Sequence, residues 1–139
     1  MKSDGTRVAL VAEVEVAAAR LLVRRVTCAV DCGQVVHPGI VEQQMHSGIM
    51  FGLSAALTGE VTFERGAAVQ SNYHDYPVLR FDEMPRIDVD IVASAKPPGG
   101  CGEPSTPLIA PAVANAIFAA TGERIRRLPI LLPGGGRRA

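Results

Sequence analysis

The chain has 139 residues, of which 47% are hydrophobic and 20% are charged, proportions typical of a globular protein with one sizeable core. Its 14 basic and 14 acidic residues balance, so nothing in the composition favours binding to nucleic acid or to an anionic membrane. No apolar run approaches the roughly 20 residues that span a bilayer, and no signal peptide is recognisable, so a cytoplasmic location is the default expectation.

The first third of the chain predicts a β-hairpin followed by a helix. Residues 1–6 are polar and without pattern, and we expect them to be disordered. Apolar residues alternate from Arg7 to Val16 and predominate from Leu21 to Val30, which predicts two paired strands. From Ile40 to Leu57 apolar residues recur every three to four positions, which predicts a helix.

Two glycines, Gly48 and Gly52, lie inside this predicted helix. Each weakens a helix by about 1 kcal/mol relative to alanine, so small side chains here indicate that something packs against the helix backbone. The packing partner could be another helix, the sheet or a cofactor. The sequence alone leaves these alternatives open.

The middle of the chain predicts a second hairpin and the clearest strand. Short strands are expected at Glu60–Arg65 and Ala67–Gln70, and the polar and aromatic segment Ser71–Arg80 is expected to be irregular. Arg86–Ser94 alternates cleanly between apolar and acidic residues, which is typical of a strand with one buried face.

The last part predicts a second helix over about residues 108–121, with Gly122 as its C-terminal cap. Arg124–Ile130 is expected to be a final short strand and residues 131–139 a loose tail. The predicted fold class is α+β, with mixed strands and two main helices in one unit over residues 7–130.

A loop rich in proline and glycine, Lys96–Pro107, joins the clearest strand to the second helix and carries a single carboxylate. That carboxylate, Glu103, lies between Gly102 and Pro104. Glycine allows the backbone to approach a ligand and proline stiffens the loop. A lone acid held in this way suits a general base whose pKa is raised by desolvation. The alternative is a surface glutamate in a proline-rich turn.

Cysteine and histidine do not indicate a metal site. Neither set has the spacing of metal ligands, and we expect buried free thiols in reducing surroundings together with structural or surface histidines. The residues are Cys28, Cys32 and Cys101, and His37, His46 and His74.

Four segments carry a resemblance to a known family. Gly102–Phe118 resembles the end of the molybdenum-binding large subunit of the xanthine dehydrogenase/aldehyde oxidase family. Ala29–Pro38 and Gln43–Leu53 are similar to the segment before the family's cofactor-facing helix and to that helix, and Ser71–Leu79 is typical of the branch that includes the isoquinoline 1-oxidoreductase β-subunit. The resemblance extends over about Arg7–Ile130.

The resemblance implies roles for three residues. Glu103 matches the family's base beside the molybdenum, Gln44 matches a glutamine that contacts the pterin, and Gly102 belongs to the same cofactor-facing loop. The metal is held by the cofactor, so no protein ligand to it is expected. Relatives of this branch more often have other residues at four positions, which here are His46, Ser47, Cys101 and Ser105.

The activity implied by the resemblance is hydroxylation of an aldehyde or an N-heteroaromatic carbon, with oxygen taken from water. It would require a molybdenum cofactor, expected in its cytosine dinucleotide form, and a small subunit carrying [2Fe–2S] clusters. The family's large subunit is far longer, so we expect a C-terminal segment that is inactive without the remaining part of the subunit. A periplasmic location stays open if the chain is exported with a partner. The alternative is a truncated, non-catalytic remnant that serves as a small binding or structural domain.

Overall fold

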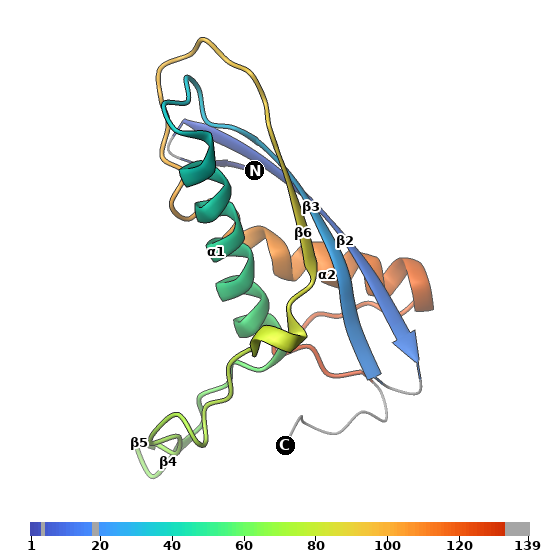
Figure 1. The fold of residues 1–139 in the computed structure, drawn as a ribbon. Coiled ribbons are helices and arrows are strands. Elements are labelled where there is room, and N and C mark those ends of the chain that lie inside the picture. Colours follow the sequence, from blue (N-terminus) through green and yellow to red (C-terminus); the bar gives the residue numbers. More distant parts are fainter. Residues whose placement is uncertain (4, 18–19, 133–139) are drawn as a thin grey trace.

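Two long antiparallel strands, β2 (Thr6–Ala17) and β3 (Arg20–Asp31), form the framework of the molecule. The computed structural model describes residues 1–3, 5–17 and 20–132, and in this part of the chain β2 and β3 lie at the centre of a sheet with the order β1-β2-β3-β6 (Figure 1). The edge strand β1 (Lys2–Ser3) is antiparallel to β2, whereas β6 (Arg86–Ile91) is parallel to β3.

Two helices enclose the core against this sheet. Helix α2 (Thr106–Thr121) packs across β2, and helix α1 (Pro38–Leu57) packs against α2 and β6. Alternate residues of β2 and β3 are buried beneath the helices, as expected for strands with one covered face. The fully buried side chains of the core include Val26, Cys28, Val30, Met45, Ile49, Leu53, Ile109, Val113 and Ile117.

The structure confirms the predicted α+β class and both main helices. The expected apolar stripe of α1 is buried from Val41 to Ala56, and α2 ends at Gly122, which has the left-handed φ of 76° typical of a helix cap. Cys28 and Cys32 are buried free thiols, as predicted, and Cys101 is half-buried. No helix among the described residues is long and apolar enough to cross a membrane.

The prediction of a strand over Arg124–Ile130 was wrong. Pro129 has no N–H to give to a strand ladder, and the Ile130 N–H instead donates to the Ala56 carbonyl at the end of α1, at 2.7 Å. The segment is therefore fixed to α1 as irregular chain. The expected loose tail also differs at its start, because Leu132 is buried in the core. Residues 133–139 lie outside the described residues.

The start of the chain also differs from the expected disorder. The N-terminal ammonium of Met1 donates to the Val8 carbonyl at 2.7 Å, and the Val8 N–H donates to the Met1 carbonyl at 3.0 Å. These bonds place Lys2–Ser3 on the edge of the sheet as β1.

A projecting segment follows α1. It contains the two short strands β4 (Phe63–Glu64) and β5 (Ala67–Ala68), which are shorter than predicted, and the 3₁₀ turn η1 (Phe81–Glu83). Figure 1 shows the β4–β5 hairpin beyond the C-terminal end of α1, away from the sheet and from α2.

The glycines of α1 face the N-terminal turn of α2. A Cβ atom on Gly52 would overlap the Thr106 carbonyl oxygen and the Ile109 side chain, and one on Gly48 would overlap the Ser105 hydroxyl. Of the partners that the sequence left open, another helix is therefore the one found at these two positions. The absent side chains allow the two helix backbones to approach closely.

We expect Gly52→Ala to destabilise the chain. Helix propensity alone would favour alanine by about 1 kcal/mol, whereas overpacking against backbone costs about 1–3 kcal/mol, so the sign of the change identifies the dominant effect. Urea unfolding measures it. Gly102→Ala is the matched control, because a Cβ there meets no atom within 4 Å, and it should leave stability nearly unchanged. A Gly52→Ala chain more stable than the wild type would contradict the packing described.

Candidate functional site

The loop that carries Glu103 is fastened at its beginning to the loop preceding α1. The Lys96 carbonyl accepts from the Gln34 N–H at 2.9 Å, and the Gly99 N–H donates to the Cys32 carbonyl at 2.8 Å. Two backbone hydrogen bonds therefore hold the two loops side by side, although they are more than 60 residues apart in sequence.

An ion pair strengthens this attachment. Asp31 accepts from the Lys96 ammonium at 3.0 Å and from the Gly33 N–H at 3.3 Å, and these bonds lower the pKa of the Asp31 carboxyl. Gly33 itself has a left-handed φ of 79°, and a Cβ on it would overlap the Pro97 carbonyl. Only glycine leaves room for the second loop at this point.

The other end of the loop is fixed to α1. Ser105 is fully buried, and its hydroxyl donates to the Met45 carbonyl at 3.2 Å. One residue later the Thr106 N–H donates to the Glu103 carbonyl at 3.0 Å, which forms the turn from which α2 begins. Glu103 is thus presented from a segment held at both ends. Ser105, one of the four unusual positions, is accommodated by a hydrogen bond of its own.

The loop, α1 and the first turn of α2 surround an open hollow of about 710 Å³. Gly102 and Glu103 lie on its rim and are exposed in this chain. The described residues therefore do not supply the desolvation that the general-base interpretation requires. The residues lining the hollow are Met1, Ser47, Gly48, Phe51, Gly102, Glu103, Pro104, Thr106 and Pro107.

Two of the three predicted site residues, Gly102 and Glu103, come together at this hollow, and the third does not line it. Gln44 is exposed on α1, one turn before Ser47 and Gly48. Sequence reasoning did not single out Phe51 or Thr106 as lining residues. A usable signal existed for Phe51, since it is a large apolar residue outside the buried stripe of its helix.

The polar side chains that line the hollow are the hydroxyl groups of Ser47 and Thr106 and the carboxylate of Glu103. The first three residues of α2 leave no backbone N–H free for a ligand, because the Thr106 N–H donates to the Glu103 carbonyl, Pro107 has none, and the Leu108 N–H donates to the Ser105 carbonyl. Within the described residues, no cluster of three or more His, Cys, Asp or Glu side chains could hold a metal ion.

Comparison with known proteins identifies the family of the chain. The model of the molybdopterin cofactor-binding domain family matches residues 5–85. The chain belongs to the molybdopterin cofactor-binding domain family. The matched part contains β2, β3, α1 and the projecting segment, and it ends before the loop that carries Glu103.

The relatives of this cofactor-binding domain include subunits of much longer oxidoreductases and dehydrogenases. The chain is 43% identical to the β-subunit of isoquinoline 1-oxidoreductase from Brevundimonas diminuta over 129 residues, which cover 91% of this chain and 16% of that protein. It is 40% identical to a nicotinate dehydrogenase subunit of Pseudomonas putida, covering 78% of this chain and 9% of that protein. The resemblance to the xanthine dehydrogenase family and its isoquinoline 1-oxidoreductase branch is confirmed.

A solved structure shares the fold of the domain. The aldehyde oxidoreductase of Desulfovibrio desulfuricans superimposes with a TM-score of 0.73 at 26% identity, over 89% of this chain and 14% of that one. The cofactor-binding domain described here therefore spans a small share of the length of the proteins that it matches.

We expect Asp31→Asn to loosen the attachment of the Glu103 loop. Because the folded-state pKa of Asp31 lies below its unfolded value of about 3.9, its stabilising effect is fully present above that value and is lost as the pH falls through the folded-state pKa. Asp31→Asn should therefore melt at a lower temperature than the wild type near neutral pH, and the difference should shrink in acid.

Thermal denaturation of both proteins between pH 7 and pH 3 measures this. Glu42→Gln, which removes an exposed carboxylate from α1, is the control and should melt like the wild type near neutral pH. A difference for Asp31→Asn that stayed constant down to pH 3 would show that the ion pair is not its source.

Proposed function

We propose that this chain supplies one wall of the cofactor site in a molybdenum hydroxylase large subunit, and that it is inactive without the remaining part of that subunit. The observation that carries the proposal is the position of Glu103, on a loop fastened at both ends, at the rim of a hollow between α1 and the N-terminus of α2. A carboxylate beside hydroxyl-bearing side chains can orient a polar ligand and accept a proton from it.

The residues have separate roles in this proposal. Glu103 accepts a proton from the reacting group, and the backbone at Gly102 lets the cofactor approach, since a Cβ there would enter open space. Ser47 and Thr106 place hydroxyl groups along the same wall. Gln44, one turn earlier in α1, would contact the pterin of the bound cofactor. The molybdenum cofactor, when bound, supplies the oxidation–reduction chemistry.

The remaining part of the large subunit is needed to exclude water from Glu103. Glu103 is exposed in this chain, and a general base operates near neutral pH when desolvation raises its pKa. A second protein surface over the hollow would exclude water and supply that desolvation. The proposal therefore assigns the chemistry to the assembled subunit.

The names of the relatives define the substrate class that we propose. Isoquinoline and nicotinate are N-heteroaromatic compounds, and the structural neighbour oxidises aldehydes according to its name. We propose a small N-heteroaromatic compound or aldehyde as substrate, the cytosine dinucleotide form of the cofactor, and a small [2Fe–2S] subunit as electron acceptor.

The test uses a complementary fragment, defined as the Brevundimonas diminuta isoquinoline 1-oxidoreductase β-subunit without the region of 129 residues that aligns with this chain. Coexpressed with this chain and the small subunit, it should give a complex that contains molybdenum and oxidises isoquinoline. Glu103→Gln keeps the shape of the side chain but cannot accept a proton, so turnover per molybdenum should fall by roughly 10²–10⁴-fold with molybdenum content unchanged. Gln44→Ala should instead lower molybdenum content more than turnover per molybdenum.

The chain purified alone is the baseline and should contain no molybdenum and show no oxidation. Near-stoichiometric molybdenum in the isolated chain would refute the need for the remaining part. Full turnover per molybdenum in Glu103→Gln would remove the catalytic role of Glu103 and leave it a turn residue.

A further inference from the structure

The segment between α1 and β6 presents large apolar side chains to solvent. We call residues 60–84 the arm. Its aromatic residues Phe63, Tyr73 and Phe81 are 72%, 89% and 89% exposed. Burying one such side chain is worth about 1.5–3 kcal/mol, so a surface that covered the three would gain this burial for each of them.

Polar contacts hold the arm in shape. The Thr62 N–H donates to the Gln70 side-chain oxygen at 2.7 Å, and the Gln70 amide donates back to the Thr62 hydroxyl at 3.1 Å. Asp75 accepts from the N–H groups of Asn72 and Ser71, each at 2.9 Å, and these bonds lower its pKa to about 2. Polar hydrogen bonds therefore hold the conformation of the arm, and its exposed aromatic rings take no part in them.

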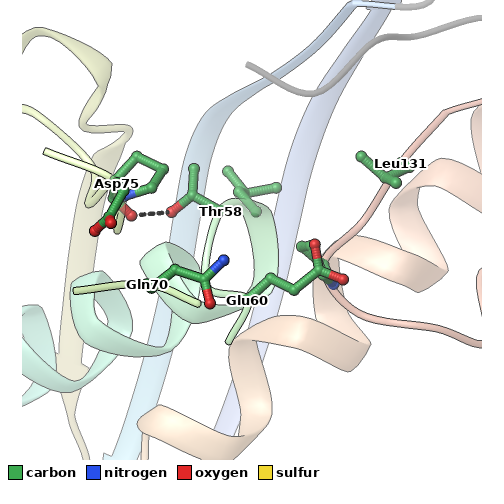
Figure 2. Close-up of a pocket in the computed structure, with 8 residues that line it drawn as sticks. Thr58, Glu60, Gln70, Asp75 and Leu131 are labelled. Atoms are coloured by element: carbon green, nitrogen blue, oxygen red, sulfur yellow. Dashed lines mark hydrogen bonds between the residues drawn. The ribbon is translucent and has the colours of Figure 1, made fainter. Parts of the chain in front are cut away.

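The root of the arm, meaning the part nearest α1, is hydrogen-bonded to the C-terminal end of that helix. The Thr58 hydroxyl donates to the Pro77 carbonyl at 2.9 Å, and the Leu79 N–H donates to the Ser54 hydroxyl at 3.1 Å. Figure 2 shows the Thr58 bond, with Gln70 and Asp75 grouped around this root. The arm thus has a defined direction relative to the core, which a docking element requires in order to bind without a large loss of conformational entropy.

The arm and the Glu103 hollow lie at different places on α1. The hollow is lined by Ser47, Gly48 and Phe51, whereas the arm leaves the helix after Leu57, more than one turn further on. A surface bound by the arm would therefore contact the domain at a place distinct from the cofactor wall.

We propose that the arm docks this domain onto the remaining part of the large subunit, through Phe63, Tyr73 and Phe81. This inference rests on the proposed function. The occupant is indicated by chain length, because the domain corresponds to 16% of the isoquinoline relative and 9% of the nicotinate relative, so most of either protein lies outside it. The family match over residues 5–85 includes the whole arm, which makes the arm part of the cofactor-binding domain itself.

Capture of the full chain by the tagged complementary fragment tests the proposal. The triple variant Phe63→Ser, Tyr73→Ser, Phe81→Ser should be captured at least 10-fold less than the wild type. Its free form should melt at the wild-type temperature, because the three side chains are exposed. Val36→Ser is the matched control, since Val36 is apolar and 94% exposed but precedes α1 at its other end, and it should be captured like the wild type.

Three results of the capture experiment would overturn the proposal: unchanged capture of the triple variant, equal loss of capture in Val36→Ser, or no capture of the wild-type chain. Sedimentation of the free chain tests whether the arm instead binds a second copy of the chain. A wild-type dimer that the triple variant abolishes would show this, and it would also overturn the proposal. Glu103→Gln should be captured normally. The capture experiment therefore tests docking by the arm separately from the catalytic role of Glu103, and either hypothesis can fail without the other.

Discussion

The close approach of α1 to the first turn of α2 determines where the rest of the site lies. Gly48 and Gly52 have no side chains, so the Ser105–Thr106 backbone lies directly on α1 and the Ser105 hydroxyl reaches the Met45 carbonyl. Larger residues would push the helices apart and move the start of α2. The loop that carries Glu103 ends at this contact. The position of the carboxylate therefore depends on glycine, which has no side chain, at positions 48 and 52.

The opposite end of that loop depends on contacts between segments distant in sequence. Asp31, Lys96 and the backbone around Gly33 join the end of β3 to the loop after β6, which the parallel pairing of these strands brings to the same edge of the sheet. The domain therefore has one packed core and two exposed surfaces to which the proposals assign binding. One is the open, mainly apolar hollow that carries the Glu103 carboxylate, and the other is the arm with its exposed aromatic residues and its own hydrogen bonds.

Periodicity was enough to predict α1, α2, β2 and β3, because each of them buries one face and its buried residues repeat at the corresponding spacing. The predicted strand at Arg124–Ile130 failed because its backbone bonds to the end of α1, a partner that local pattern cannot reveal. The same limit applied to the glycines of α1, whose partner depends on the tertiary fold. At the candidate site, the resemblance predicted Glu103, Gly102 and Gln44, of which the first two line the hollow and the third does not. The contacts that hold the Glu103 loop had no local signal in the sequence.

A double-mutant cycle between Gly48 and Ser105 tests the helix contact most directly. A Cβ on Gly48 would overlap the Ser105 hydroxyl, so Gly48→Ala alone should lower the free energy of unfolding, and Ser105→Ala alone should cost about 1 kcal/mol for its lost hydrogen bond. Removing the hydroxyl makes room for the new methyl group. The double variant should therefore be more stable than the sum of the single changes predicts, by about 1 kcal/mol or more, measured by urea unfolding. Strict additivity of the two changes would contradict the account, because it would mean that the two residues do not meet.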